Sequence, residues 1–172
     1  MNTQWKTIGE LTDKTVLGTS GLASGTPRRK SRAILINPDG KCAIIHEQAS
    51  NLHMLPGGSI EPGEDEISAL IREISEETGC TCDTVTPLGI VSENRFHAGI
   101  TRLSYFFVVR TKTLHPVPHF TPEEISLGTT IKWCSMDEAL RLIKSAHHDA
   151  PQKKFIQARD LIALTEYLSN PT

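Results

Sequence analysis

An acidic helix behind a glycine- and proline-rich loop is the feature that most constrains this chain. Residues 58–80 read GSIEPGEDEISALIREISEETGC. Three glutamates, Glu73, Glu76 and Glu77, follow the spacing i, i+3 and i+4, so they share one face of the predicted helix. Like charges at these spacings repel one another. A divalent cation is the natural compensation, because carboxylate oxygens suit hard ions such as Mg²⁺ or Mn²⁺.

The same helix has an apolar row, which predicts how it packs. Ile67, Leu70, Ile71 and Ile74 follow helical spacing. At 100° per residue, the acidic row lies about 120° around the helix from this apolar row. Gly79 stands where a glycine cap ends a helix. We therefore expect all four apolar residues to pack on a core while the acids point outward.

This segment resembles the Nudix box, whose pattern is G-x5-E-x7-R-E-U-x-E-E-x-G-U with U an aliphatic residue. The matching positions are Gly58, Glu64, Arg72, Glu73, Ile74, Glu76, Glu77 and Gly79. Cys80 departs from the pattern at the last U, where it is still small and apolar. The resemblance implies an α/β fold, namely the Nudix-type α/β/α sandwich with a mixed β-sheet.

The resemblance also implies a reaction, the hydrolysis of a nucleoside diphosphate linked to another moiety X, with Mg²⁺ as cofactor and Mn²⁺ as the alternative ion. It implies Glu76 and Glu77 as direct metal ligands, and Glu73 as a ligand or as the group that orients the attacking water. A backbone carbonyl of the loop, assigned to Gly58, is expected to complete the metal site. Arg72 is expected to orient Glu73 through a charge-assisted hydrogen bond.

Many members of the family draw a further carboxylate from a loop well after the box. The candidates here are Glu124 and its neighbour Glu123, with Glu93 as a third option. Each has a simpler interpretation as a surface acid, and Glu124 is the first choice for a catalytic role. Glu64, at the junction of loop and helix, is expected to stabilise the loop.

Three residues are predicted to contact the substrate. Arg95 and His97 belong to a polar segment, residues 93–99, which we predict to be a loop between two strands. Arg32 begins a predicted strand and is separated by one residue from the basic triplet 28–30. That triplet has two interpretations, a solvated entry to the strand or a contact with phosphate.

The box predicts a reaction class and leaves X open. Secondary signatures of the ADP-ribose, dinucleoside polyphosphate and NADH branches are absent after the box, and no coenzyme A pattern precedes it. A general nucleotide pyrophosphohydrolase of the MutT-like type therefore remains the first hypothesis. The alternatives are a Nudix-fold module that senses a nucleotide without cleaving it, and an RNA 5′-end pyrophosphohydrolase.

Composition limits the partners of the chain. The formal net charge is −2 over 172 residues, which argues against a dedicated nucleic-acid binder. No apolar run is long enough for a membrane span, and the first residues lack the apolar stretch of a secretion signal. We therefore expect a cytoplasmic enzyme that acts on a small nucleotide.

The pattern along the chain predicts one domain. Residues 1–30 are interpreted as an N-terminal extension with one short strand, and residues 31–172 as the Nudix hydrolase domain. Strands are expected over 32–36, 42–46, 52–55, 86–92, 103–110 and 131–134, and helices after 135 and after 149. The N-terminal extension and the last helix could build a homodimer or cover the core of a monomer.

Overall fold

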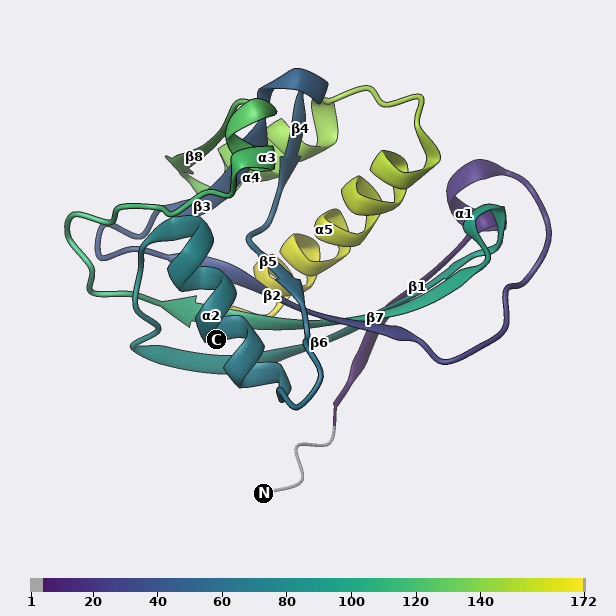
Figure 1. Ribbon diagram of the computed structural model, residues 1–172, viewed down its shortest axis with the longest axis horizontal. Helices are drawn as coiled ribbons and strands as arrows, with labels where there is room; N and C mark the ends of the chain where they lie inside the picture. Colours follow the sequence, from purple (N-terminus) through teal and green to yellow (C-terminus); the bar gives the residue numbers. More distant parts are fainter. Residues whose placement is uncertain (1–4, 172) are drawn as a thin grey trace.

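The computed structural model describes residues 5–171 as a sandwich of helices on both faces of a mixed β-sheet (Figure 1). The strands are β1 (Thr7–Thr12), β2 (Arg28–Ile36), β3 (Cys42–Glu47), β4 (Leu52–Met54), β5 (Gly57–Ser59), β6 (Thr84–Arg95), β7 (Ile100–Arg110) and β8 (Thr129–Cys134). The helices are α1 (Asp13–Leu17), α2 (Glu66–Thr78), α3 (Pro122–Ser126), α4 (Met136–Ser145) and α5 (Pro151–Ser169), with 3-10 turns η1 (Gln48–Ser50) and η2 (Phe96–Ala98). The predicted α/β/α sandwich with a mixed sheet is confirmed.

The strands form one sheet in the order β1-β6-β7-β2-β3-β4, with β5 paired to β2 and β8 paired to β3. The β1–β6 and β2–β7 pairs are parallel, and the other pairs are antiparallel. Strand β1 therefore joins the same sheet as the rest of the chain. The division into an extension, 1–30, and a domain, 31–172, stays a prediction.

Local sequence signals placed the six predicted strands, although β2 begins at Arg28 instead of Arg32 and β7 at Ile100 instead of residue 103. Asn37 to Lys41 form the expected turn, in which the Gly40 N–H donates to the Asn37 carbonyl at 2.9 Å. Gly40 has φ +74°, a conformation that favours glycine. The predicted loop 93–99 is wrong at its start, because β6 continues to Arg95 and pairs with β7 up to Ile100. The connection is only the short turn η2 with Gly99.

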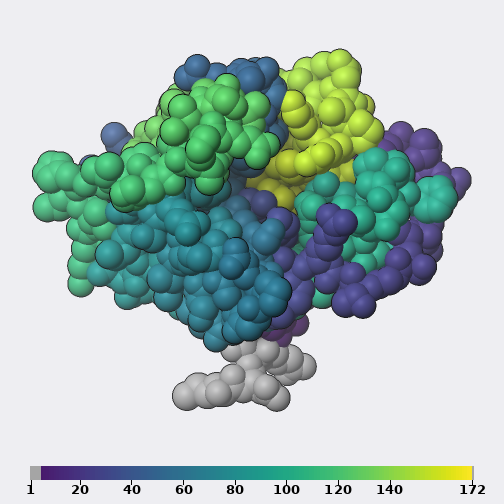
Figure 2. Space-filling model, in the orientation of Figure 1, coloured from purple at the N-terminus to yellow at the C-terminus, as the bar shows by residue number. Residues whose placement is uncertain are grey.

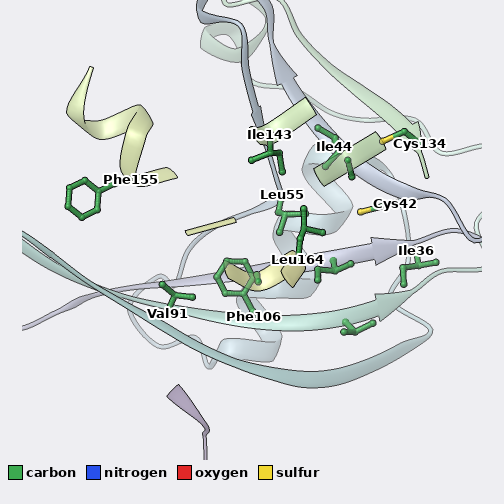
Figure 3. Close-up of a cluster of buried hydrophobic side chains, with 14 of the residues drawn as sticks. Ile36, Cys42, Ile44, Leu55, Val91, Phe106, Cys134, Ile143, Phe155 and Leu164 are labelled. Carbon is green, nitrogen blue, oxygen red and sulfur yellow. The ribbon is translucent and has the colours of Figure 1, made fainter. Parts of the chain in front are cut away.

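Two apolar cores lie on the two faces of the sheet. One packs between the sheet and helices α4 and α5, where Phe106, Leu55 and Leu164 gather (Figure 3). The other packs between the sheet and α2. Strand β2 contributes to both, since Ile34 belongs to the α5 side and Ala33 to the α2 side. Because side chains alternate along a strand, basic residues at even positions of β2 lie on the α5 side.

Helix α2 is rotated relative to our expectation. Its buried residues are Ala69, Leu70, Ile74 and Thr78. Ile67 and Ile71 are 47% and 46% exposed, so the prediction that all four apolar residues pack on the core is wrong for these two. The physical reason is that β5 lies against the side of α2 that carries Glu73 and Glu77.

Helix α5 crosses the other face of the sheet (Figure 1). Phe155, Ala163 and Leu164 are buried, as are the charged neighbours Arg159 and Asp160. Among the helices of residues 5–171, none combines the length and the apolar character that a membrane crossing requires.

Candidate active site

The guanidinium of Arg72 connects the loop to helix α2. Its Nε and Nη2 donate to the two carboxylate oxygens of Glu64 at 2.8 and 2.9 Å, and Nη2 also donates to the carbonyl of Ser59 at 2.9 Å. Its Nη1 donates to Glu73 at 2.9 Å and to Glu76 at 3.4 Å. The hydrogen bond from Arg72 lowers the pKa of Glu64 to about 2. This carboxylate therefore stays ionised and holds the loop against the helix.

Glu73 lies directly against the backbone of Gly58. A Cβ placed on Gly58 would come within 2.2 Å of Glu73 Oε1, so only glycine leaves room for the carboxylate. The Glu73 side chain is 15% exposed. Burial raises its pKa, and the charge of Glu76 adds to this effect although the Arg72 hydrogen bond opposes it.

Glu77 occupies the inner end of the acidic row. Its Oε2 accepts a hydrogen bond of 2.6 Å from the N–H of Gly57. The pKa of Glu77 is raised to about 8, mainly by burial and in part by the carboxylates of Glu73 and Glu124, although the Gly57 hydrogen bond and the charge of Arg32 oppose this. Glu73 and Glu77 thus point inward toward Gly58 and Gly57 of β5. The outward orientation that we expected applies only to Glu76, which is 55% exposed.

These residues fit a hard divalent cation. Burial is the main cause of the raised pKa of Glu77, and the carboxylates of Glu73 and Glu124 contribute to it; a cation bound here would favour the ionised form. Carboxylate and backbone carbonyl oxygens are the ligands that Mg²⁺ and Mn²⁺ accept. Within residues 5–171, no three His, Cys, Asp or Glu side chains are already grouped as a metal cluster. Glu73, Glu76, Glu77 and the Gly58 backbone are the groups that could hold the ion.

Glu124 lies close enough to Glu77 to raise its pKa. In α3, however, the Glu124 carboxylate accepts from Thr121 N and Oγ1 at 2.7 and 2.8 Å, which completes a capping box. The segment that we interpreted as a loop is therefore the first turn of a short helix. A catalytic role for Glu124 would require it to leave this cap.

Basic side chains from β2 and α5 face the site from the α5 side of the sheet. Arg32 is buried, and its Nη1 donates to the carbonyl of Leu55 at 3.1 Å. Asp160 accepts from Leu55 N at 2.9 Å and from Arg159 Nε at 2.8 Å, while Arg159 Nη1 and Nη2 find no partner among residues 5–171. Burial lowers the pKa of Lys30 to about 8, and the charges of Arg32 and Arg102 act in the same direction. Positive charge thus stands beside the acidic row.

The other predicted substrate residues, Arg95 and His97, lie apart from the acidic row. Arg95 and His97 line one pocket together with Arg102. His97 Nδ1 lies 2.9 Å from Asp13 Oδ1, and the His97 N–H donates to Asp13 Oδ2 at 2.7 Å. Glu93, a third option for a catalytic acid, is buried and bonded to Arg95 at 2.9 Å. It is therefore a counter-ion for arginine in this structure.

Sequence reasoning missed Arg102, Arg159 and Asp160, and it left Lys30 in a triplet with two interpretations. A signal existed for Lys30, because Arg28, Lys30 and Arg32 alternate along one strand and must share a face. For Arg159 and Asp160 the sequence offers no such signal, since adjacent opposite charges on a helix are typical of an exposed surface.

Comparisons with known proteins agree with this geometry. The family model described as “NUDIX domain” matches residues 26–158, more than half of the chain. The chain is 34% identical over 61 residues to “8-oxo-dGDP phosphatase NUDT18” of Mus musculus, covering 34% of this chain and 19% of the relative. It is 32% identical over 63 residues to “Putative 8-oxo-dGTP diphosphatase” of Bacillus subtilis, covering 37% and 42%. The matched stretch thus spans less than half the length of either curated relative.

Solved structures share the fold over a longer span. A “NUDIX hydrolase from Nitrosomonas europaea” superposes with a TM-score of 0.60 at 25% identity, covering 84% of this chain and 90% of that one. A MutT Nudix hydrolase from Burkholderia pseudomallei gives a TM-score of 0.57 at 18% identity, covering 78% and 98%, which supports the fold alone. Because the residues of the box are present and the family model matches residues 26–158, the chain belongs to the Nudix hydrolase family.

Proposed function

We propose that this protein hydrolyses a diphosphate bond in a nucleoside diphosphate linked to a moiety X, with Mg²⁺ as cofactor. The observation that carries the proposal is the arrangement of Glu73 and Glu77. Both carboxylates are held at the backbone of Gly57 and Gly58, and both have a raised pKa. A helix built only for stability would not collect buried like charges at this place.

The charged residues of helix α2 and the Gly58 carbonyl have distinct roles in this proposal. Glu76 and Glu77 bind the ion together with the carbonyl of Gly58, and Glu73 binds it or orients the water that attacks phosphorus. Arg72 positions Glu73 through the 2.9 Å hydrogen bond. When bound, Mg²⁺ neutralises charge on the diphosphate oxygens and on the phosphoryl group being transferred. Glu124 assists as a further carboxylate after it leaves its cap.

The basic side of the hollow binds the substrate. Lys30 donates to Ser59 Oγ beside the loop, so its ammonium lies near the acidic row. Arg32 contributes positive charge from the same face of β2. Phosphoryl transfer needs the phosphates to be positioned as well as neutralised, and cations facing the metal ligands provide this.

Oxidised purine nucleotides are the first substrates to test. The curated relatives carry 8-oxo-dGDP and 8-oxo-dGTP in their names, and each is about one-third identical over a stretch of about 60 residues. We propose a small nucleotide as the substrate of this chain and extend the relatives' chemistry to it on that basis. A homodimer built by the N-terminal extension and the last helix is a further proposal, with a monomer as the alternative.

The test is an assay of the purified protein with Mg²⁺ and a set of nucleotides. The set contains 8-oxo-dGTP, 8-oxo-dGDP, dGTP, ADP-ribose and a dinucleoside polyphosphate, and the products are identified by mass spectrometry in H₂¹⁸O. Glu77→Gln should lower turnover by at least about 100-fold, or about 2.7 kcal/mol of transition-state stabilisation. Glu10→Gln, which removes the same charge at an exposed position on β1, is the matched control.

The outcomes separate the hydrolase from the sensing module. Cleavage by the parent and by Glu10→Gln, with loss in Glu77→Gln, supports the hydrolase, and the position of ¹⁸O identifies the phosphorus attacked. A nucleotide that binds tightly and is recovered unchanged after long incubation with Mg²⁺ would instead favour the sensing module.

A further inference from the structure

A pocket rich in arginine adjoins the candidate active site. It encloses about 430 Å³ between the end of β6, the start of β7 and the start of α5. We call it the arginine pocket and define it by Arg28, Arg95, His97, Arg102, Pro151 and Gln152. Figure 2 shows the surface hollowed between the box segment, α5 and the β6–β7 turn.

The arginine pocket is continuous with the loop of the box. A second hollow of about 280 Å³ is lined by Lys30 and Ser59, and it shares Arg28 and Arg102 with the arginine pocket. Ser59 belongs to β5, next to Gly58. A ligand that has its diphosphate at the box could therefore extend along β2 and β7 into the arginine pocket.

Positive charge in the arginine pocket exceeds negative charge. Arg95 Nη2 donates to Glu93 at 2.9 Å, and Arg102 Nε lies 3.6 Å from the other oxygen of the same carboxylate. Glu93 thus serves two guanidinium groups, and Arg28 adds a third cation. The Nε groups of Arg95 and Arg102 have no hydrogen-bond partner among residues 5–171. An ion pair built for stability alone would match charges and satisfy these donors.

Two of these arginines, Arg95 and Arg102, are also held in place. Arg95 is 2% exposed, and its guanidinium stands 4.9 Å from the centre of the Phe155 ring. The Arg102 side chain is 11% exposed. Burial lowers the pKa of Arg102 to about 10, and the charge of Arg95 contributes to this lowering. The repulsion between these buried cations is unfavourable, and a bound anion would reduce it.

Helix α5 adds a further source of positive potential. It runs for 19 residues from Pro151, and no side chain caps its first turn at Ala150. Ala150, Pro151 and Gln152 all line the arginine pocket. The positive end of the helix dipole therefore meets the same space as the arginines, an arrangement that favours a phosphate.

We propose that the arginine pocket binds a phosphate group carried by X, so that the protein favours substrates in which X ends in phosphate over those in which X is a neutral sugar. This inference rests on the proposed function, because it requires the reacting diphosphate to lie at the box. Guanidinium groups bind phosphate through paired N–H donors, and a helix N-terminus adds a dipole of the matching sign. A free phosphate ion has the same chemistry and is the other source to distinguish.

The first experiment measures binding without turnover. Inorganic pyrophosphate is titrated by calorimetry into the metal-free protein, and the parent should bind it. Arg28→Gln and Arg102→Gln should weaken binding by about 10-fold or more, since a hydrogen bond to a charged group contributes about 1.5–3 kcal/mol. Arg141→Gln, at a 71% exposed position on α4, is the control of equal charge change.

Arg28→Gln tests binding without removing the counter-ion of a buried carboxylate, so we expect this variant to fold. Arg28 lines the arginine pocket, whereas Arg102 also neutralises the buried Glu93. A loss of binding in Arg102→Gln alone, together with a lower melting temperature, would count against the proposal. Absence of pyrophosphate binding to the parent would overturn it whether or not the protein hydrolyses nucleotides.

The second experiment identifies the source of the phosphate. GTP and GDP-mannose share guanosine diphosphate and differ in X, which is a phosphate in one and a neutral hexose in the other. Arg28→Gln should raise KM for GTP about 10-fold more than KM for GDP-mannose, with a smaller change in kcat. Equal changes for both substrates would assign the pocket to a free phosphate ion or to the shared diphosphate, and would overturn the assignment to X.

Discussion

Arg72 and Glu64 form a two-point contact, Nε to Oε1 at 2.8 Å and Nη2 to Oε2 at 2.9 Å, across the junction between the loop and helix α2. The remaining terminal nitrogen of the same guanidinium reaches Glu73 at 2.9 Å. The planar guanidinium of Arg72 thus holds the loop and also orients the Glu73 carboxylate. Lysine carries the same charge but cannot reproduce the fork.

Arg72→Lys should therefore separate charge from geometry. We expect turnover to fall about 10- to 100-fold, since a charged hydrogen bond contributes about 1.5–3 kcal/mol. Steady-state kinetics with Mg²⁺ measure this, and Arg141→Lys at an exposed position is the control. Turnover unchanged in Arg72→Lys would show that charge alone is sufficient at this position.

Gly58→Ala tests the contact between the loop and Glu73. The new Cβ would lie within 2.2 Å of Glu73 Oε1, so the carboxylate must move. We expect turnover to fall by at least about 10-fold, because a displacement of about 1 Å in a positioned group is already costly. Circular dichroism should show the fold retained. A variant that is fully active would mean that Glu73 works from another position.

Mg²⁺ should raise the thermal stability of the parent. A ligand at 100 times its Kd stabilises the native state by about 2.7 kcal/mol, which for a chain of this size corresponds to a rise of about 5–10 °C in Tm. Differential scanning fluorimetry with EDTA and then with Mg²⁺ measures the shift. Glu77→Gln should abolish most of it and Glu10→Gln should not. An equal shift in both variants would place the ion elsewhere.

The sequence predicted those parts of the fold that depend on local signals. Helix α2 begins after Asp65, whose side chain caps Ser68 N, and it ends at Gly79 with φ +69°. The turn at Asn37 to Gly40 is also determined by neighbouring residues, since the Gly40 N–H donates to the Asn37 carbonyl. These signals act within a few residues and survive without tertiary context.

Other features depend on contacts between distant segments. Ile67 and Ile71 are exposed because β5 packs against the acidic side of α2, and no spacing within the helix indicates this. Arg95 lies in a strand because β7 pairs with it, although its polar neighbours resemble a loop. The arginine pocket, too, exists only once β2, β6, β7 and α5 are assembled.

His53 should make stability depend on pH. Its ring stacks on His46 with centroids 4.1 Å apart, and burial lowers its pKa to about 4, helped by the charges of His46 and Lys132. Between about pH 4 and 6.5 the unfolded chain binds this proton and the native chain does not. Stability should therefore be fully present above about pH 6.5 and be lost as pH falls toward 4, at up to about 1.4 kcal/mol per pH unit.

Urea unfolding from pH 4.5 to 7.5 measures this slope. His53→Gln cannot titrate and should have a shallower slope than the parent over that window. His115→Gln, at an exposed position, should keep the parental slope. If His53→Gln and the parent show the same slope, the depressed pKa is wrong.

Asp160 should be the residue whose loss most destabilises the site. It accepts from Arg159 Nε at 2.8 Å and from Leu55 N at 2.9 Å, just before the loop of the box. Asp160→Ala leaves Arg159 buried without its partner, which should cost about 3–5 kcal/mol, whereas Asp149→Ala at a 96% exposed side chain should cost under about 0.5 kcal/mol. Urea unfolding of both variants tests this. If the unpaired charge is the cause, adding Arg159→Met to Asp160→Ala must recover stability, and a further additive loss in the double variant would instead assign the effect to the Leu55 contact.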